Sequence, residues 1–454
     1  MNNKHVEIFN LLVKAYYDGD FDTTLTRVMG THEQSPQDTY EIITTLCGVS
    51  IPYDNDYIKN LKKAITHYTV NQRIVRKLES CSENCLRDND GQSTCQKACP
   101  FDAIIYNEDQ GMTHIDYNKC THCGFCVDAC KHGKILDKIE FLPILDLINN
   151  KKTVVAAVAP AISGQFGSDV TMDQIRAALI KVGFTDMIEV AFAADMLTIK
   201  ESVEFDKHVH GPNDLMITSC CCPMWVGMLK KVYKELVPDL SPSVSPMIAA
   251  GRVIKKLNKD AAVVFIGPCI AKKAEAKEKD VAGAIDFVLT FKELEEIFKI
   301  LEINPRDLKG IPSVEYASRG GRLYARTGGV SIAIGEAIEE MYPEKHKLFK
   351  PTQAHGIREC KEVLEKALTG QLDANFIEGM GCVGGCVGGP KILVPPEQGK
   401  KAVDEFAYDS AIKVATNSEV LDDILNKLGI DSLKDFEDPN KIHILERDFS
   451  APTK

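Results

Sequence analysis

The second half of a cysteine-rich stretch reads CTHCGFCVDAC, which spaces its thiols as C-x2-C-x2-C-x3-C. This spacing lets three thiolates wrap one [4Fe-4S] cluster while the fourth reaches a second cluster. The preceding stretch, CSENCLRDNDGQSTCQKACP, is an expanded version of the same half-motif. The crossed rule predicts two cluster sites, one made by Cys81, Cys85, Cys95 and Cys130 and the other by Cys99, Cys120, Cys123 and Cys126.

A pair of structural zinc sites is the alternative, because C-x2-C pairs occur in both kinds of site. Eight cysteines at this spacing, with a proline after Cys99, fit the bacterial ferredoxin arrangement better. Lys131 follows Cys130 where a proline is usual, and the first half-motif has longer gaps than normal. These departures affect the expected reduction potentials and not cluster binding. His122, inside the motif, is predicted to be exposed and not to tune a cluster.

Three further cysteine motifs follow: TSCCCPMW, GPCIAKKAE and EGMGCVGGCVGGP. Each places thiols at the end of a predicted strand or in a glycine-rich loop. Glycines let the backbone approach a bulky inorganic centre and donate N–H groups to it. Buried thiolates need a metal or a positive charge nearby, and Lys272 and Lys273 lie within four residues of Cys269. The motifs therefore predict an inorganic centre in this part of the chain.

Together the three motifs resemble the signature motifs of the [FeFe]-hydrogenases, in the same order, and the resemblance spans about residues 79–395. The triple cysteine, the glycine before Pro268 and the shortened glycine run look most like the group B branch, which includes a clostridial ferredoxin-linked enzyme. The resemblance implies an H-cluster, in which a [4Fe-4S] cube is joined through a cysteine sulfur to a two-iron subsite. That subsite carries CO, cyanide and a bridging azadithiolate.

By position, the resemblance assigns the four cube ligands to Cys222, Cys269, Cys382 and Cys386. Cys386 is the implied bridge to the two-iron subsite. Cys222 is preferred over Cys220 because it precedes Pro223. Lys272 is expected to hold a cyanide of the distal iron by a charge-assisted hydrogen bond, and Met380 to pack beside the two-iron subsite.

The segment AVAPAI resembles a family stretch around the cyanide of the proximal iron, which assigns Pro160 and Ala161 to that position. Ala161 stands where a serine is frequent, so one hydrogen bond is expected to be missing. Pro268 directly precedes a cube ligand and is assigned to the cofactor site. Gly267 replaces the methionine of the family's MPC motif, and Met247 replaces a glutamine after SP.

The family's proton relay starts at a cysteine that matches Cys221. A thiol with a pKa near ~8.5 can exchange protons at neutral pH without being a permanent metal ligand. Ser241 in LSPSVSP matches a relay serine. Where the family carries a glutamate, the stretch LTIKESVEF offers Ser202, with Glu201 and Glu204 one and two positions away.

The elements that must position these residues change in character along the chain. Residues 1–78 carry apolar positions at helical spacing and predict a helical region, and residues 79–138 predict a 2[4Fe-4S] ferredoxin-like domain. From residue 150, the apolar runs KTVVAAVAPAI, DLMITSC, AAVVFIGPC and DFVLTF alternate with amphipathic stretches such as MDQIRAALIKVGF and TFKELEEIFKIL. This alternation predicts an α/β domain with largely parallel sheets. The resemblance implies a two-lobed α/β catalytic domain over residues 150–454.

Composition bounds the class of protein. The 454 residues are too many for one ordinary core, and the net charge of -11 argues weakly against a nucleic-acid partner. The start of the chain lacks a signal-peptide pattern, and no apolar stretch reaches the ~18 residues of a membrane helix. The chain is therefore expected to be cytoplasmic, where sixteen cysteines are better explained as metal ligands than as disulfides. Cys47 and Cys360 are predicted to be small buried hydrophobic residues, and the lysine-rich AKKAEAKEKD a solvated helix face.

These features predict a ferredoxin-dependent hydrogenase that interconverts protons and H2. The expected partners are ferredoxin or a similar electron carrier and maturation proteins that deliver the two-iron subsite, with no nucleic acid and no membrane. One alternative is a slow regulatory relative, against which the absence of a recognisable sensor or output domain counts. The other is a hydrogenase-like iron-sulfur assembly protein without the two-iron subsite. Retention of Lys272, Met380 and Cys221 favours the enzyme over that assembly protein.

Overall fold

A four-stranded parallel sheet forms the centre of one half of the large α/β part. The computed structural model describes residues 2–31, 34–70, 72–79, 81, 90–150, 152–314 and 317–449. The strands lie in the order β6-β5-β8-β9, and all three pairings are parallel. Their bounds are β5 (Val154–Val158), β6 (Asp186–Glu189), β8 (Ala262–Gly267) and β9 (Phe287–Thr290). Every residue of β5, β8 and β9 is buried, as expected for parallel strands covered on both faces.

Helices on both faces supply that cover. They are α7 (Phe141–Asn149), α8 (Met172–Val182), α11 (Pro246–Leu257) and α13 (Phe291–Ile300). α8 and α13 each begin with a capping box, at Thr171 and Thr290. The threonine side chain accepts a hydrogen bond from the backbone N–H of the third helical residue, whose side chain accepts one from the threonine backbone N–H. The predicted strands over the apolar runs and the predicted helices between them are confirmed.

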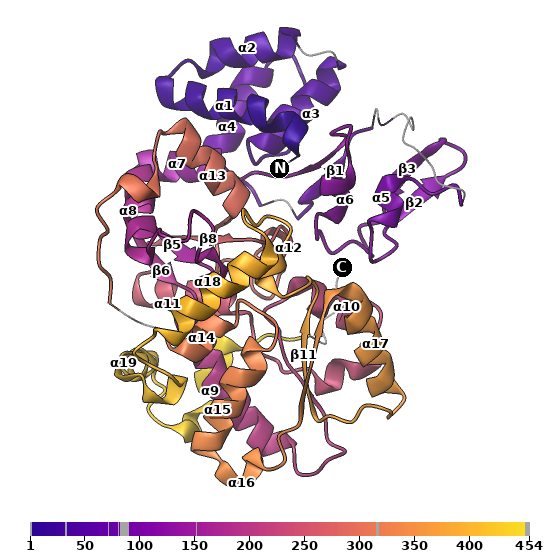
Figure 1. Cartoon of the computed structure of the whole chain (residues 1–454). Coiled ribbons are helices and arrows are strands. Elements are labelled where there is room, and N and C mark those ends of the chain that lie inside the picture. The colour runs from indigo at the N-terminus through magenta and orange to yellow at the C-terminus, as the bar shows by residue number, and fades with distance from the viewer. Residues whose placement is uncertain are drawn as a thin grey trace.

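A three-stranded parallel sheet, in the order β10-β11-β7, forms the centre of the other half. Its strands are β7 (Met216–Ile217), β10 (Pro351–His355) and β11 (Phe376–Met380). Figure 1 shows β11 between α10 (Pro223–Lys231) and α17 (Gly356–Leu368) on one side and α9 (Ala191–His208) and α15 (Gly329–Met341) on the other. Ile377 packs toward the first pair of helices, whereas Phe376 and Met380 pack toward the second, as the two-residue period of a strand requires.

The N-terminal helices form a separate layer on this α/β part. They are η1 (Asn3–His5), α1 (Val6–Asp18), α2 (Phe21–Thr31), α3 (Pro36–Leu46) and α4 (Tyr57–Thr66). Figure 1 shows them stacked over α7 and α13, with α1 against α13 and α4 against α7. The helix predicted over VEIFNLLVKAYY is confirmed, and the one predicted over YIKNLKKAITHYTV is confirmed as far as Thr66, where α4 ends.

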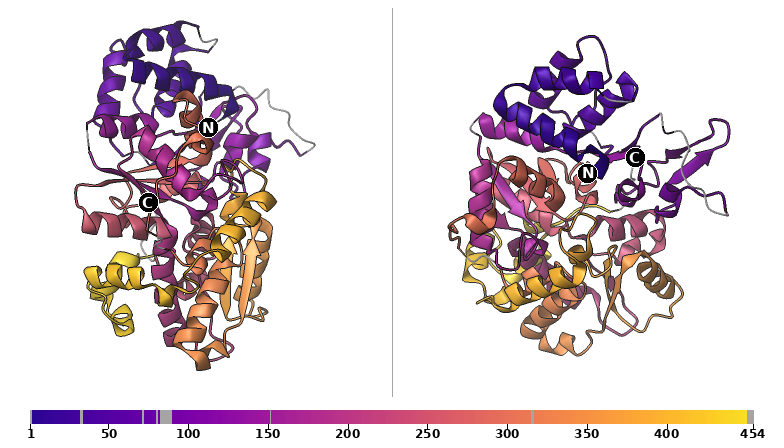
Figure 2. Two further views of the ribbon diagram at one scale, coloured as in Figure 1. Left: turned by 60° about the vertical axis from the view of Figure 1, so that its left-hand side comes forward. Right: turned by 45° about the horizontal axis from the view of Figure 1, so that its top comes forward.

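The cysteine-rich part contains short elements around its thiols. It comprises β1 (Val75–Lys77), α5 (Thr94–Lys97), β2 (Ile104–Asn107), β3 (Met112–Ile115), α6 (Phe125–Ala129) and β4 (Ile135–Asp137). β1 pairs antiparallel with β4, and β2 with β3. Figure 2 shows this part projecting from the side of the molecule next to the N-terminal helices. The fifteen described cysteines are all free thiols.

The remaining elements connect the sheets and follow them to the end of the described chain. They are η2 (Pro160–Ile162), η3 (Lys234–Asp239), α12 (Ala271–Glu275), η4 (Pro305–Asp307), α14 (Arg319–Leu323), α16 (Pro343–His346), η5 (Cys386–Gly388), α18 (Pro396–Tyr408), η6 (Ala415–Asn417), α19 (Glu419–Leu428), η7 (Leu433–Glu437), α20 (Pro439–Ile442) and η8 (His443–Leu445). Among the described residues, no helix combines the length and the apolar character that crossing a membrane would require.

The prediction that AKKAEAKEKD forms a solvated helix face is wrong. Lys272, Lys273 and Lys277 in this segment are all buried. Each ammonium pairs with a buried carboxylate; the Lys273 Nζ, for example, lies 2.5 Å from Glu293 Oε1, and the Lys277 ammonium pairs with Glu140. Buried charges are tolerated when they are paired in this way. The predicted burial of the lone Cys47 and Cys360 is confirmed.

Candidate functional site

Four thiols meet where the strands of both sheets end. Cys222 caps α10 shortly after β7, Cys269 follows β8, and Cys382 and Cys386 follow β11. Carboxyl ends of parallel strands are the usual place for sites in α/β folds. The thiol of Cys382 interacts electrostatically with the other three, and that of Cys386 with Cys222 and Cys269. The structure therefore brings together the four cysteines that the resemblance assigns to the cube.

Burial controls the protonation of these thiols. Desolvation raises the pKa of Cys269 and of Cys386 to about 12 in each case. Such thiols stay protonated at neutral pH unless a metal displaces the proton. No three His, Cys, Asp or Glu side chains in the described ranges lie close enough together to hold a single metal ion. The donor set of four soft sulfurs fits an iron-sulfur cube.

The three adjacent cysteines of TSCCCP face different surroundings. The backbone N–H of Gly381 donates a hydrogen bond to Cys222 Sγ at 3.3 Å. The thiol of Cys220 instead donates to the carbonyl of Ser241 at 3.0 Å. Cys222, and not Cys220, therefore joins the four-thiol set, and Cys221 remains for another environment.

Cys221 faces a largely apolar cavity with a volume of about 50 Å³, next to the four thiols. Apart from the thiols of Cys221 and Cys386, its wall carries two polar groups, the Lys272 ammonium and the Tyr324 hydroxyl. The rest of the wall is formed by Ala159, Pro160, Ala161, Val190, Ala191, Ala194, Pro246, Met247, Phe265 and Ala325. Pro160 and Ala161 thus lie in the same cavity as the bridging cysteine.

Lys272 enters this cavity as a paired cation. Its Nζ lies 2.7 Å from Oε2 of Glu275, which is also buried. Although burial opposes the charge, the Glu275 carboxylate holds the pKa of Lys272 above its usual value. An ammonium held in an apolar cavity can donate hydrogen bonds to an anionic ligand there. The cavity fits a small group that carries negative charge.

Two predicted site residues act at the edge of the cavity. Met380 lies at the end of β11 and is not part of the cavity wall; a Cβ on Gly385 would come within 2.8 Å of its sulfur. The carbonyl of Pro268 accepts a hydrogen bond from the backbone N–H of Lys391 at 3.0 Å. The Met380 sulfur thus packs within the loop after β11, whereas the Pro268 hydrogen bond links that loop to the loop after β8.

The predicted relay residues give a mixed result. Ser241 Oγ donates to Glu204 Oε2 at 2.6 Å and lies 2.8 Å from Ser243 Oγ. Ser202 donates to the carbonyl of Thr198 in its own helix. The structure therefore separates Ser202 from the hydroxyls that surround Ser241.

Glu201, one position before Ser202, is the residue of this stretch that contacts the hydroxyls around Ser241. Its buried carboxylate accepts a hydrogen bond from Thr218 Oγ1. Burial, followed by the nearby Glu204 carboxylate, raises the pKa of Glu201 to about 7. The signal that could have found Glu201 is its i, i+3 spacing from Glu204, which puts both carboxylates on one face of α9, whereas Ser202 faces away.

A second buried carboxyl with a raised pKa, that of Asp195, holds the start of α14 in place. Tyr324, which lines the cavity, directly follows this helix. Asp195 accepts hydrogen bonds from the Ser318 N–H at 2.7 Å and from the Ser318 hydroxyl at 2.5 Å. Burial raises its pKa to about 7, although the Ser318 hydrogen bonds oppose this. The folded protein therefore holds a proton on Asp195 that the unfolded chain releases near pH 4.

This shift makes stability depend on pH in a stated direction. The stabilisation from protonated Asp195 is fully present below about pH 4 and is lost as the pH rises to about 7, by about 4 kcal/mol in total. The variant Asp195→Asn is expected to flatten this part of the profile of unfolding free energy against pH. Urea titrations at several pH values measure it, and an unchanged slope in the variant would contradict the assignment.

In the cysteine-rich part, four thiols line one small pocket. They are Cys99, Cys120, Cys123 and Cys126, the set expected from the crossed rule. Cys81, Cys95 and Cys130, from the other predicted set, are also buried. Cys85 lies outside the described residues. The donor set of Cys99, Cys120, Cys123 and Cys126 fits a [4Fe-4S] cluster.

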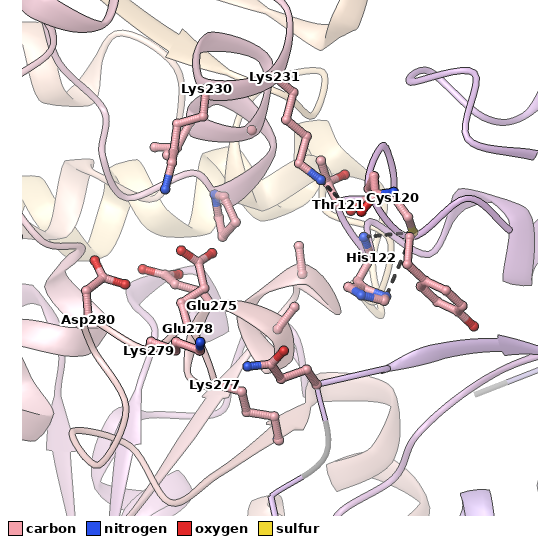
Figure 3. Close-up of a pocket in the computed structure, with 18 of the residues that line it drawn as sticks. Cys120, Thr121, His122, Lys230, Lys231, Glu275, Lys277, Glu278, Lys279 and Asp280 are labelled. Atoms are coloured by element: carbon pink, nitrogen blue, oxygen red, sulfur yellow. Dashed lines mark hydrogen bonds between the residues drawn. The ribbon is translucent and has the colours of Figure 1, made fainter. Parts of the chain in front are cut away.

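His122 is not the exposed residue that the sequence predicted. Its ring is half-buried, and Nδ1 accepts a hydrogen bond from the Val75 N–H at 3.2 Å and lies 3.8 Å from Cys120 Sγ. The backbone N–H of His122 donates to the same sulfur at 3.3 Å. A left-handed backbone conformation at His122, with φ of 55°, turns the ring back onto the thiol. Figure 3 shows His122 and Cys120 on the wall of an open cleft, opposite Glu275.

Comparison with known proteins agrees with this geometry. The family described as iron only hydrogenase large subunit, C-terminal domain, matches residues 152–390, and a 4Fe-4S binding domain matches residues 112–135. The chain is 26% identical over 403 residues to NADP-reducing hydrogenase subunit HndD of Solidesulfovibrio fructosivorans (74% of this chain). It is 27% identical over 383 residues to iron hydrogenase 1 of Clostridium pasteurianum (64% of this chain). It spans 66% of the length of each of these two proteins.

Relatives with a different described role also match. Cytosolic iron-sulfur assembly component 3 of Rattus norvegicus is 23% identical over 357 residues, 64% of this chain and 74% of that protein. Among solved structures, a variant of [FeFe]-hydrogenase HydA1 from Chlamydomonas reinhardtii shares the fold with a TM-score of 0.55. The match has 23% identity and covers 65% of this chain and 93% of the other. Because the hydrogenase family matches more than half of its 454 residues, this chain belongs to the iron-only hydrogenase large-subunit family.

Proposed function

We propose that this protein is a ferredoxin-dependent hydrogenase of the group B type, which interconverts two protons and two electrons with H2. The observation that carries the proposal is the apolar cavity beside the four thiols, into which Cys221, Lys272 and Cys386 project. A cube on Cys222, Cys269, Cys382 and Cys386 would extend through Cys386 to a two-iron subsite in that cavity. The subsite, with its CO, cyanide and azadithiolate ligands, would supply the metal chemistry of proton reduction.

The residues of the cavity have separate tasks in this proposal. Lys272, held by Glu275, would donate a charge-assisted hydrogen bond to a cyanide ligand. Pro160 and Ala161 form part of the apolar wall that would surround the other cyanide, and Met380 and Pro268 keep the cysteine loops in place. An apolar enclosure excludes water and strengthens each of these polar contacts.

A line of polar groups provides the proposed proton path. Cys221 exchanges the proton at the cavity, and Glu201, which titrates near neutral pH, takes it up. Ser243 and Ser241 then connect Glu201 to Glu204, the carboxylate nearer the surface. A carboxylate with a pKa near the working pH is suited to both accepting and releasing protons.

Replacement of Glu201 tests this path against the alternative at Ser202. Glu201→Gln keeps the size but removes the titrating group, so hydrogen evolution should fall by roughly 10²-fold or more and the inflection near pH 7 should vanish. Ser202→Ala is the matched control, because the Ser202 hydroxyl bonds only to the carbonyl of Thr198 among its described contacts. Rates against pH for both variants distinguish the two positions. Loss in the serine variant alone would refute the path through Glu201.

Electrons follow a second line in the proposal. The [4Fe-4S] clusters that the ferredoxin-like domain would hold would supply the electron route between ferredoxin and the cube. The interaction between the thiols of Cys123 and Cys382 supports this route, because it links the nearer cluster site to the cube site. The proposal includes three parts of the chain, a helical region over 1–78, the ferredoxin-like domain over 79–138 and a two-lobed catalytic domain over 150–454. It also includes a cytoplasmic setting and maturation proteins that deliver the two-iron subsite.

An iron-sulfur assembly protein is the second candidate, because assembly components match the chain over much of its length. Such a protein would use the cube cysteines without a two-iron subsite. Infrared spectroscopy after maturation with the two-iron cofactor, together with a hydrogen-evolution assay, separates the candidates. CO and cyanide bands with turnover support the hydrogenase, and bands with negligible turnover indicate a regulatory relative. Intact [4Fe-4S] signals without bands would favour assembly.

A further inference from the structure

A fully buried lysine connects the two parts of the molecule that carry cluster sites. Lys391 directly follows the EGMGCVGGCVGGP loop, and none of its side chain is exposed. Its backbone N–H donates to the carbonyl of Pro268, the residue before Cys269. Its ammonium lies 2.5 Å from Oδ1 of Asp128 in α6. One residue thus touches both cube loops and the ferredoxin-like domain.

The partner of this lysine lies between cluster ligands. Asp128 stands between Cys126 and Cys130 in the sequence, and these cysteines are assigned to different clusters. The Asp128 side chain is 39% exposed, so water reaches the anion but not the cation. Asp137 in β4 supplies a further negative group that interacts with Lys391. The cation is therefore held by Asp128 and Asp137 of the cysteine-rich part, and Glu293 in α13 is a further negative group that interacts with it.

The surrounding junction leaves little room for movement. The thiols of Cys123 and Cys382 interact across it. Beside them, a Cβ on Gly124 would lie only 2.2 Å from Cδ1 of Ile270, so α6 begins in direct contact with the loop after Cys269. The ion pair of Lys391 adds a polar contact, buried on the lysine side, to this packed junction.

Charges at such a junction act on redox equilibria. Reduction adds one negative charge to an iron-sulfur cluster, which a nearby cation favours and a nearby anion opposes. At an effective dielectric constant of about 20, a unit charge roughly 10 Å from a redox centre changes its ratio of reduced to oxidised forms by about tenfold. Hydrogen bonds, net charge and exposure are the protein's means of setting these potentials.

We propose that Lys391 is a positioning residue for electron transfer between the cluster site of Cys99, Cys120, Cys123 and Cys126 and the cube. Its ion pair with Asp128 holds the two cluster sites at a fixed separation. The balance between the Lys391 cation and the Asp128 anion sets how readily the clusters next to this ion pair are reduced. The inference rests on the cluster assignment of the proposed function, but it does not require the two-iron subsite.

The test uses full-length protein reconstituted with its [4Fe-4S] clusters and without the two-iron subsite. Redox titration followed by electron paramagnetic resonance at fixed pH measures the reduced fraction of each cluster. Lys391→Met keeps the apolar stem but leaves the Asp128 anion, so the ratio of reduced to oxidised cluster at a given potential should fall by about tenfold. Asp128→Asn leaves the cation and should raise that ratio.

Opposite shifts distinguish a charge effect from simple loosening, which would move both variants in the same direction. The double variant removes both charges and should return the ratio close to the original value, which gives a second measurement of the charge effect if Lys391→Met folds poorly. Lys345→Met is the matched control, because Lys345 donates to the carbonyls of Asp206 and Val209 at the far end of the molecule (Figure 1).

Shifts of the same sign, or none, at full iron content would overturn the proposal. Magnetic coupling between the reduced clusters reports their separation and should weaken in Lys391→Met but not in the control. A wild-type chain that loads no clusters would refute this inference together with the cluster assignment. Missing CO and cyanide bands after maturation would refute only the hydrogenase activity.

Discussion

Replacing Cys221 by alanine is expected to lower hydrogen evolution by roughly 10²–10⁴-fold, the range that a positioned acid–base group contributes. Cys221 is the cavity thiol that does not belong to the four-thiol set and interacts with Cys386 and Lys272. Its loss should therefore leave the cube and the two-iron subsite in place while removing the proton carrier. Turnover and infrared bands measured on the same sample separate these two effects.

Cys220→Ala is the control for this prediction. Cys220 is also buried and adjacent in sequence, but its thiol donates to the carbonyl of Ser241 and lines no described cavity wall beside Lys272. Its replacement should change turnover far less than replacement of its neighbour. Equal losses in the two variants, or a loss of infrared bands in Cys221→Ala, would show that Cys221 acts in binding and not in proton exchange.

The second large effect is expected for Lys272→Met. This variant leaves the buried Glu275 carboxylate without its ammonium partner, and breaking a buried pair in this way typically costs about 3–5 kcal/mol. Arg447 also interacts electrostatically with Glu275, so the expected loss of unfolding free energy lies toward the lower end of this range. The same change removes the cation of the cavity, so the two-iron subsite should bind poorly or show shifted cyanide bands.

Urea unfolding of the variant measures the first of these effects. Lys299→Met serves as the comparison, because Lys299 pairs with Glu296 and Glu295 on the surface, where such pairs contribute about 1 kcal/mol or less. A Lys272 variant as stable as this control would mean that Glu275 takes up a proton or another partner. Normal cyanide bands in that variant would remove Lys272 from the proposed site.

The sequence predicted those parts of the site that depend on local spacing. The thiols of CTHCGFCVDAC, and the placing of Cys222, Cys269 and Cys382 after strands, follow from patterns within a few residues. The parallel sheets were predictable for the same reason, because short apolar runs and amphipathic helices alternate regularly.

Features that depend on distant partners could not be predicted in this way. Lys273 and Lys277 are buried because Glu293 and Glu140, far away in the sequence, neutralise them. His122 turns inward because Val75 offers an N–H and the backbone adopts a left-handed conformation. Glu201 was missed by one residue, and in a helix one residue changes the direction of a side chain by about 100°.

The antiparallel pairing of β1 with β4 determines how the cysteine-rich part is attached to the rest of the molecule. The chain enters and leaves that part at adjacent points, so the cluster-binding segment is an insertion whose two ends are held side by side by β1 and β4. The N-terminal helices contact α7 and α13 directly, and Asn2 and His5 before α1 also hydrogen-bond to the cysteine-rich part. Oxidative loss of the clusters is therefore expected to unfold the cysteine-rich part locally, while the helical layer and both parallel sheets stay folded and can bind new clusters.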